Sequence, residues 1–340
     1  MNKVINEKKE ISTNQNISKS GGSVFTKKNL ILALAIIVTY FIIVILSEYV
    51  LNRHFNSLIV PIGINVILAV SLNLTTGFLG ELSLGHAGFM AIGAYAGSIF
   101  TIYANLPSAI EFILGLLIGG IFAAFFGVII GVPVLRLKGD YLAIVTLAFG
   151  EIIRSIINYL PITGGAMGLS KIPRYATFTW TYIIMIITII LISNFVKSRH
   201  GRAVCTIREN FLAADSIGIK VSKYKIMAFV IAAFFAGIAG VLYAHTFSSI
   251  KPVIFDYNKS IEILVIVVLG GMGSIRGSII AAVLLTVLPE LLRGTDDLRM
   301  LLYSLVLIAM MLFNSSDIRT KLEESGKLPK LPKLSKSRAK

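Results

Sequence analysis

The sequence predicts an all-α integral membrane protein, a polytopic bundle of about ten transmembrane helices. Its 340 residues are 56% hydrophobic and only 14% charged, with a mean hydropathy of +0.84. The apolar residues gather in runs that approach the roughly 20 residues a spanning helix needs. Because backbone polar groups in lipid must be satisfied within the segment, these runs are expected to form helices.

The expected helices follow one another along the chain. Seven runs are long enough to span a bilayer: residues 30–46, 58–74, 84–104, 110–135, 141–160, 178–196 and 226–247. Three shorter runs follow at 261–270, 278–292 and 298–313. If 261–270 and 278–292 are separate helices, there are ten crossings and both termini lie on the same side. If they form one helix, the termini lie on opposite sides.

The distribution of charge sets the expected orientation. The formal net charge is +15, and the basic residues gather in a polar N-terminal tail (1–29), a central segment (198–225) and a C-terminal tail (314–340). By the positive-inside rule all three are cytoplasmic, which favours ten crossings within a permease domain at 30–313. The same distribution argues against nucleic-acid binding. The N-terminal tail lacks the apolar core of a cleavable signal peptide.

The central segment 198–225 is too polar to span a membrane. Residues at spacings of three and four form one apolar helical face: Val204, Ile207, Phe211 and Ala214. The opposite side carries polar residues: Arg202, Thr206, Glu209 and Asn210. The pattern predicts a short cytoplasmic helix, at about 203–218, that docks onto a partner through its apolar face.

Two segments interrupt the apolar pattern with glycine, TGFLGELSLGHAGFMAIGAYAG at 76–97 and LGGMGSIRG at 269–277. GELSLGHAGF loosely resembles GGMGSIRGSI, which suggests a duplicated unit. Glycine breaks at corresponding places in two halves indicate a substrate pathway in transporters, whereas tight helix packing or a re-entrant turn is the alternative. The candidate pathway residues are Gly77, Gly80, Ser83, Gly85, His86, Gly88, Thr163, Gly271 and Gly273.

Other small residues indicate packing. Gly115, Gly119, Ala123, Gly127 and Gly131 recur every four residues in one run, and Ala232, Ala236, Gly240 and Ala244 do so in another. This spacing lets helix backbones approach closely in lipid, where no hydrophobic force drives association.

Several ionisable residues lie in or near the apolar runs, and most are expected to have a structural role. Glu151 and Arg154 are predicted to form an ion pair facing the bundle, Glu262 to lie near an interface, and His86 to be either packed or functional. No His/Cys cluster has metal-ligand spacing, no nucleophile lies next to a base, and G-x-x-x-x-G-K-[ST] does not occur. The chain is therefore expected to be non-catalytic, without a metal or cofactor of its own.

Three stretches resemble branched-chain amino-acid ABC transporter permeases of the LivH/LivM type, over roughly residues 58–313. They are SLNLTTGFLGELSLGHAGFMAIGAYAG (71–97), TGGAMGLSKIP (163–173) and GRAVCTIRENFLAADSIGIKVSKYKIMAFVIAAFFAGIAGVLYA (201–244). The long N-terminal extension and the GRA-x-x-x-IRE-N form look more like the LivM type. The resemblance implies a permease subunit of a leucine, isoleucine and valine importer in the bacterial cytoplasmic membrane. It also implies four partners: a LivH-type permease subunit, two ABC ATPase subunits that use ATP and Mg²⁺, and an extracytoplasmic binding protein.

The resemblance also implies that the central segment contains a helix that couples the permease to an ATPase subunit. Membrane lipid is expected to surround the transmembrane helices. The candidate residues of the coupling helix are Arg202, Val204, Ile207, Arg208, Glu209, Phe211, Ala213, Ala214, Asp215 and Gly218. Many importer permeases carry Glu-Ala-Ala-x-x-x-Gly here, but this chain has leucine in place of the glutamate. Arg208, Glu209 and Asp215 are candidates to take over its role.

Other functions stay open at this point. A related ABC permease for urea, amides or other amino acids would look alike, because the binding protein usually sets specificity. An ion-coupled secondary transporter would fit the broken helices but needs a carboxylate or proton relay at the bilayer midplane. A membrane enzyme or scaffold has no catalytic constellation to support it.

Overall fold

The computed structural model describes residues 53–104, 106–137 and 139–291, with a few isolated positions before and after them. The chain divides into two compact units, Met1–Asn56 and Ser57–Lys340, and the helices below belong to the second, apart from residues 53–56 at the start of the first helix. The predicted tails lie outside the described residues. So do the predicted helices 30–46 and 298–313, apart from isolated helical positions. The number of crossings therefore remains a prediction.

The described part of the chain is helical, with one isolated β-bridge, which confirms the predicted fold class. The long helices are α3 (Arg53–Asn73), α4 (His86–Tyr103), α5 (Ser108–Val134), α6 (Asp140–Tyr159), α7 (Phe178–Lys197), α10 (Val221–Phe247), α11 (Tyr257–Gly270) and α12 (Ile275–Leu291). The shorter elements are the π-helix η1 (Leu74–Leu79), the α-helices α8 (Arg199–Glu209) and α9 (Phe211–Ser216), and the 3₁₀ turns η2 (Pro161–Thr163), η3 (Gly165–Met167) and η4 (Pro252–Phe255). Within the described ranges, four segments are long and apolar enough to cross a membrane: 57–79, 108–134, 178–197 and 221–247.

The shorter pair, α11 and α12, forms a hairpin. The prediction of two separate helices is confirmed, because the chain turns at residues 271–274 between them. At ~1.5 Å per residue, helices of 14 and 17 residues fall short of the ~30 Å hydrocarbon core. Gly270 and Gly277 let them meet closely, since a β-carbon on Gly270 would lie 2.5 Å from the Gly277 carbonyl carbon.

Small residues bring α4, α5 and α10 together. A β-carbon on Gly93 of α4 would lie 2.2 Å from the Gly237 carbonyl oxygen of α10, and one on Gly237 would lie 2.5 Å from Ala123 Cβ of α5. One turn further along α10, a β-carbon on Gly240 would lie 2.0 Å from the Met90 carbonyl oxygen of α4. The predicted packing role is confirmed for Ala123 and Gly240, and Gly93 and Gly237 have the same role without having been predicted. Helix α10 presents small residues to two neighbours.

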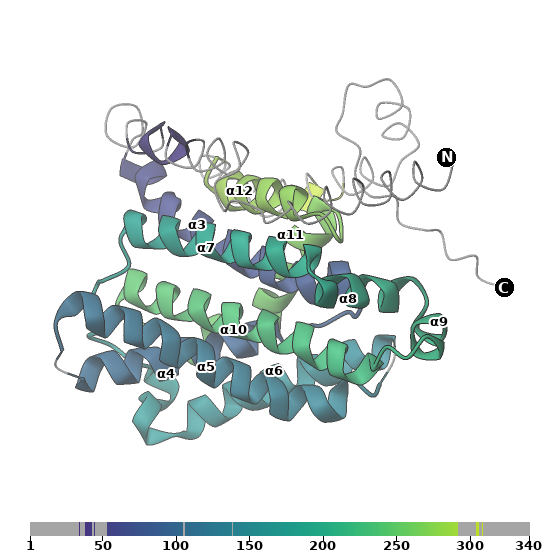
Figure 1. Cartoon of the computed structure of the whole chain (residues 1–340). Coiled ribbons are helices and arrows are strands. Elements are labelled where there is room, and N and C mark those ends of the chain that lie inside the picture. The colour runs from purple at the N-terminus through teal and green to yellow at the C-terminus, as the bar shows by residue number, and fades with distance from the viewer. Residues whose placement is uncertain are drawn as a thin grey trace, which may run out of the picture. The chain divides into compact units, whose positions relative to one another are not determined.

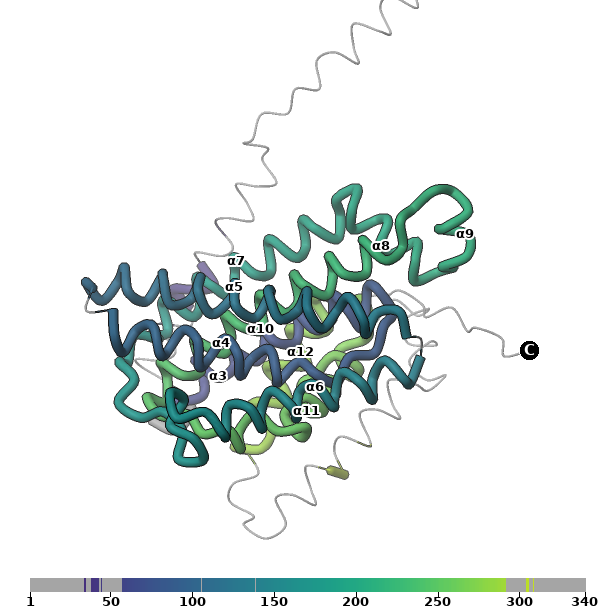
Figure 2. Tube along the Cα trace, turned by 90° about the horizontal axis from the view of Figure 1, so that it is seen from below, coloured from purple at the N-terminus to yellow at the C-terminus, as the bar shows by residue number. Residues whose placement is uncertain are grey.

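The long helices run alongside one another, so the helix bundle has two ends (Figures 1 and 2). At one end, the α8 end, α8 meets η1 through the Arg208–Gly77 contact, and the beginning of α10 meets the chain after η1 through the Lys225–Glu81 ion pair. At the opposite end, Leu169 pairs with Ile250 through backbone hydrogen bonds of 3.0 and 2.9 Å. Segments predicted to share a side of the membrane thus meet at the same end.

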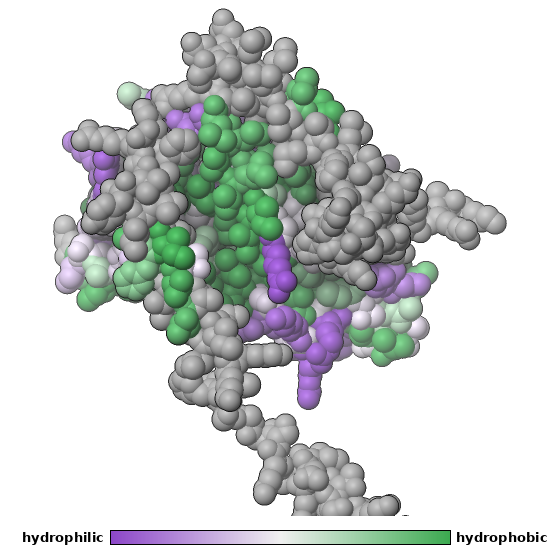
Figure 3. Space-filling model, turned by 90° about the horizontal axis from the view of Figure 1, so that it is seen from above, coloured by the Kyte–Doolittle hydropathy of each residue, from purple (hydrophilic) through white to green (hydrophobic). Residues whose placement is uncertain are grey.

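The outer surface is apolar over large areas. On α5 alone, Ile121 and Phe125 are 58% and 59% exposed. Seen from above, apolar side chains form a broad stretch with hydrophilic residues gathered along one border (Figure 3). Apolar patches of this kind are rare on proteins in water, and they fit contact with lipid or another membrane subunit.

The close approach of α4 and α10 makes Gly93→Ala an informative change. The added methyl group meets backbone atoms that cannot turn away, so we expect a loss of about 1–3 kcal/mol despite the better helix propensity of alanine. Thermal unfolding of the protein in lipid nanodiscs measures this loss of stability. Gly150→Ala is the matched control, because its β-carbon would lie 3.7 Å from Gly85 Cα. Equal unfolding temperatures for both variants would contradict the packing described here.

Candidate functional site

The central segment folds as two helices at the α8 end. Ser198 begins α8 by accepting a 3.2 Å hydrogen bond from Gly201 N. Asn210 then adopts an extended backbone, and its Oδ1 accepts bonds from Leu212 N and Ala213 N at 3.0 and 3.1 Å. The prediction of one helix over 203–218 is wrong, because asparagine caps a new helix more favourably than it continues an old one.

The apolar face predicted from spacing lies mostly against the protein itself. Val204, Ile207 and Ala214 are buried in a cluster with three further residues from η1 and α10, namely Leu74, Leu79 and Ala228. Phe211, the fourth residue of that face, is 37% exposed. The face therefore holds α8 and α9 on their own chain and leaves only Phe211 partly exposed to a partner.

A different set of side chains is presented at the α8 end. Leu212 and Ile217 are 68% and 71% exposed, and Glu209 and Asp215 are exposed beside them along the chain. We call these four residues with Phe211 the α9 surface; α9 lies beyond the end of α7 (Figures 1 and 2). Exposed apolar residues rimmed by charges are typical of a protein-binding surface. Sequence reasoning missed Leu212 and Ile217. Leu212 does not fit the spacing of the apolar face, and Ile217 lies three residues after Ala214 but was not included in that face.

Three of the remaining predicted coupling residues are exposed. Arg202 is exposed on α8, and Ala213 and Gly218 are exposed at α9 and the turn after it. Gly218 has φ of +85° and open space around it, so it supplies the left-handed turn into α10.

Arg208 points inward. Its Nη1 donates a 2.5 Å hydrogen bond to the Gly77 carbonyl oxygen. Its aliphatic part lies against Gly80, where a β-carbon would be 2.9 Å from Arg208 Cγ. Of the three charges considered as substitutes for the missing glutamate, Glu209 and Asp215 are exposed, whereas Arg208 is bound to its own chain.

The two glycine-rich breaks meet beside Arg208. Asn73, at the end of α3, accepts a 2.8 Å bond from Gly273 N on Oδ1 and donates a 2.9 Å bond from Nδ2 to Ser278 Oγ. A β-carbon on Gly77 would lie 1.7 Å from Asn73 Oδ1 and 2.3 Å from Gly273 N. The segments lie 200 residues apart in sequence, and both have irregular backbone here, a π-helix on one side and a left-handed turn on the other. Such π-helical turns are frequent at functional sites.

An ion pair adds a second contact between this region and α10. Glu81 lies two residues after the end of η1, and its carboxylate pairs with the ammonium group of Lys225, four residues after the start of α10. The two side chains are 15% and 9% exposed. Removing one partner of so buried a pair is strongly destabilising, because it leaves the other charge uncompensated.

The candidate pathway residues do not line one cavity. Gly77, Gly80, Gly271 and Gly273 belong to the meeting of the two breaks. Gly85 and Gly88 instead let α4 approach α6, since their β-carbons would lie 2.5 Å from the Thr146 carbonyl oxygen and 2.9 Å from Gly150 Cα.

The other pathway candidates are packed or distant. His86 is buried, with Nε2 2.9 Å from Ser71 Oγ, which fits the packed interpretation. Ser83 is buried nearby along the chain. Thr163 lies at the opposite end, where its hydroxyl donates to the Ile157 and Leu160 carbonyl oxygens at the end of α6.

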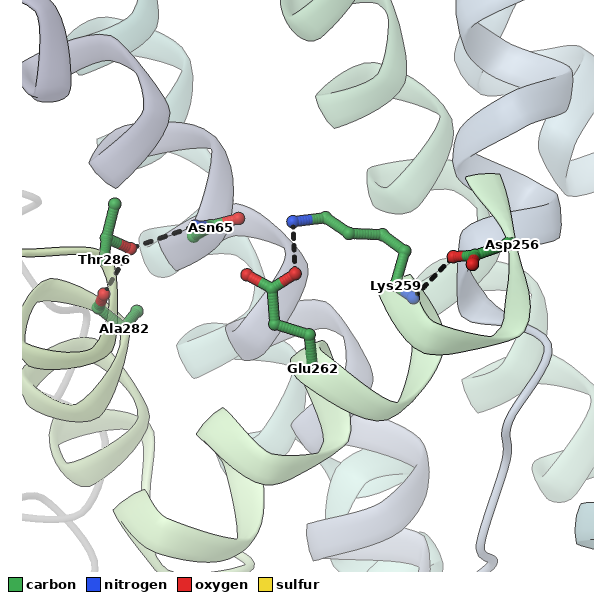
Figure 4. A network of polar contacts seen from close by, with 6 residues as sticks. All are labelled: Asn65, Asp256, Lys259, Glu262, Ala282 and Thr286. Atoms are coloured by element: carbon green, nitrogen blue, oxygen red, sulfur yellow. Dashed lines mark hydrogen bonds and ion pairs between the residues drawn. The ribbon is translucent and has the colours of Figure 1, made fainter. Parts of the chain in front are cut away.

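The other acidic residues that the sequence singled out are paired. Arg154 and Glu151 form the predicted ion pair at 2.6 Å, but their side chains are 33% and 28% exposed, so the pair lies at the edge of α6 and not inside the bundle. Glu262 contacts Lys259 at 3.0 Å in the first turns of α11 (Figure 4). No group of three or more possible metal ligands occurs among the described residues.

Comparison with known proteins identifies the family of the chain. The family model described as "Branched-chain amino acid transport system / permease component" matches residues 55–314. The chain belongs to this family. No solved structure matches it at a significant level.

Named relatives are permease proteins. The chain is 37% identical over 285 residues to the high-affinity branched-chain amino acid transport system permease protein LivM of Escherichia coli (strain K12), covering 74% of this chain and 66% of the relative. It is 26% identical over 270 residues to the corresponding LivH protein of Salmonella typhimurium, covering 72% and 86%. A nucleoside ABC transporter permease protein, NupC of Lactococcus lactis, is 25% identical over 190 residues, covering 50% and 60%. The chain thus spans about two thirds of the length of its LivM relative, and it resembles LivM more than LivH.

The contact between α8 and the first break can be tested by cross-linking. A β-carbon on Gly80 would lie 3.6 Å from Arg208 Cβ, within the roughly 3.5–4.5 Å range of disulfides. Gly80→Cys with Arg208→Cys is therefore expected to form a disulfide under mild oxidation, although φ of +80° at residue 80 disfavours cysteine by about 1–3 kcal/mol.

The cross-linking needs a cysteine-free background. Cys205 is the single cysteine of the sequence, and burial raises the pKa of its thiol, so Cys205→Ser removes a slow competitor. Gly80→Cys with Arg202→Cys is the control, since Arg202 is exposed on the same helix. A mobility shift after partial proteolysis detects the bond. Equal cross-linking of both pairs would show that α8 does not hold the described orientation.

Proposed function

We propose that the chain is the permease subunit of an ABC importer for branched-chain amino acids, driven by separate ATPase subunits that dock on the α9 surface. The exposed apolar side chains of Leu212 and Ile217 carry this proposal. They project at the end of the molecule to which the positive-inside rule assigns the cytoplasm, where ATP is found. A helix that inserts apolar anchors into a groove, with charges at the rim, is a common way for one protein to bind another.

The proposal includes a complete importer. Relatives of both LivM and LivH type support pairing with a second, LivH-type permease subunit in the bacterial cytoplasmic membrane, with both termini cytoplasmic. Two ATPase subunits supply ATP hydrolysis with Mg²⁺, and an extracytoplasmic binding protein delivers the substrate. The chain itself is then a non-catalytic subunit without a cofactor.

Leucine, isoleucine and valine are the proposed substrates because the family description and the LivM relative both name branched-chain amino acids. Nucleosides are a second candidate, supported by the weaker similarity to NupC. Uptake of labelled leucine into proteoliposomes containing the whole complex and its binding protein tests this, with unlabelled valine, uridine and urea as competitors. Competition by valine alone supports the proposal, and competition by uridine alone contradicts it.

An ion-coupled secondary transporter is less well supported. Such a protein needs an exchangeable carboxylate near the bilayer midplane. Among the described residues, the buried or nearly buried carboxylates lie near helix ends: Glu81 pairs with Lys225 at the α8 end, and Glu111 lies in the first turn of α5. Glu111 accepts a 3.3 Å bond from Leu106 N, as expected of an acidic residue near a helix N-terminus.

Docking on the α9 surface is tested by Leu212→Asp and Ile217→Asp. Each places a carboxylate where the proposal needs an apolar contact, so we expect at least a tenfold loss of ATPase subunits that purify with the tagged permease. The matched control is Val253→Asp, because Val253 is 66% exposed at the opposite end. It should retain the ATPase subunits. Normal co-purification and ATP-dependent uptake by both α9 variants would contradict the proposed docking.

A further inference from the structure

We propose that Arg208 is a positioning residue that connects the ATPase-docking segment to the α11–α12 hairpin, so that movement of α8 is transmitted to both glycine breaks. This inference rests on the proposed function, because it assumes that ATPase subunits move α8 and α9. It assigns the transmission to one side chain and the contacts around it.

The first step is the reach of Arg208. From α8 its guanidinium donates to the Gly77 carbonyl oxygen of η1 at 2.5 Å. The same nitrogen, Nη1, lies beside the second break, because a β-carbon on Gly273 would be 2.8 Å from it. One side chain therefore contacts two segments that are distant in sequence. A planar guanidinium with five N–H donors suits this better than the compact ammonium of lysine.

The second step is the contact between the breaks. The Asn73 amide uses its oxygen for Gly273 N and its nitrogen for Ser278 Oγ, so its orientation is set on both sides. Ser278 belongs to the first turn of α12, and its hydroxyl also lies 3.2 Å from the Ser274 carbonyl oxygen. The end of α3, the turn of the hairpin and the start of α12 are joined by this amide.

The third step is the connection along α12. Asn65 of α3 donates a 2.9 Å bond to Thr286 Oγ1, whose hydroxyl donates to the Ala282 carbonyl oxygen at 2.6 Å (Figure 4). α3 therefore bonds to α12 at two levels, near residues 278 and 286. A displacement that reaches the Gly77 region is passed to the hairpin as a unit.

Apolar packing alone does not make this connection. Val204 and Ile207 of α8 pack on Leu74 and Leu79 of η1, and these contacts are non-directional. Arg208 adds a directional bond to the Gly77 carbonyl oxygen of η1, and the same nitrogen lies beside Gly273 of the second break. If Arg208 served only to anchor α8, its loss would lower stability or assembly without changing how much solute moves per ATP hydrolysed.

The test uses the whole transporter complex in proteoliposomes. Arg208→Met keeps most of the aliphatic stem and removes the guanidinium, and Arg208→Lys keeps the charge without the planar fork. Arg199→Met is the matched control, because Arg199 is an exposed arginine of the same helix that is not among the predicted coupling residues. Three quantities are measured: co-purified ATPase, ATP hydrolysis, and solute taken up per ATP.

We expect Arg208→Met to retain ATPase subunits and at least half of the hydrolysis, with uptake per ATP reduced tenfold or more. Arg208→Lys should recover less than half of the lost coupling, and Arg199→Met should behave as the original chain. A spin label at Ile280→Cys, exposed on α12, reports hairpin movement in a Cys205→Ser background. Trapping with ATP and vanadate should shift its distance to a label on the ATPase, and Arg208→Met should abolish the shift.

Uptake per ATP within twofold of the original chain in an assembled Arg208→Met complex would overturn this inference and leave the proposed function intact. Loss of ATP-dependent uptake by the original chain would instead overturn the proposed function. If Arg208→Met fails to assemble, Ser278→Ala is the milder variant, because it leaves Arg208 in place and removes one hydroxyl, which bonds to the Asn73 amide and to the Ser274 carbonyl oxygen. It should lower uptake per ATP at least threefold, and unchanged coupling in this variant would also overturn the inference.

Discussion

The meeting of the two glycine breaks depends on the missing side chain of Gly77. A β-carbon there would lie 1.7 Å from Asn73 Oδ1 and 2.3 Å from Gly273 N, so only a hydrogen atom lets η1 approach the α11–α12 turn. That approach brings Asn73 within bonding distance of Gly273, and it leaves the Gly77 carbonyl oxygen for Arg208. The π-helix, the hairpin and the docking segment thus share one set of contacts, around which the α8 end is arranged.

The rest of the bundle uses close backbone approach for a different purpose. α4, α5 and α10 interlock through glycines such as Gly93 and Gly237, the means by which helices gain packing energy in lipid. The hairpin differs, because side-chain hydrogen bonds recur where it contacts its neighbours. Thr286 accepts a bond from Asn65 of α3, and Ser260 accepts one from the Ala87 amide of α4. Such bonds contribute only about 0.6–2 kcal/mol each in membranes. The interlocked helices form a rigid part, against which a hairpin held partly by replaceable bonds can be repositioned.

Much of the fold could be predicted from the sequence, because apolar runs and glycine breaks are local signals. The separation of α11 from α12 and the packing role of the small residues belong to this class. The structure of the central segment was harder to predict. A spacing of three and four residues through Val204, Ile207, Phe211 and Ala214 fits two short helices as well as one, and only the bonds that Asn210 makes distinguish them. The inward course of Arg208 depends on η1 lying beside α8, a contact between residues 131 positions apart that no local pattern encodes.

The missing glutamate of the importer pattern acquires a physical meaning from these positions. Leu212 stands where that pattern has the acidic residue, and it is 68% exposed, so the position offers an apolar side chain to a partner. Burying a leucine contributes about 1.5–3 kcal/mol, whereas an exposed ion pair contributes about 0–1 kcal/mol and weakens with salt. In the proposed complex, docking then rests on apolar burial, with Glu209 and Asp215 at the rim. Arg208 does not take part in this docking contact. In the proposed mechanism its guanidinium lies inside the permease and connects the docking segment to the α11–α12 hairpin.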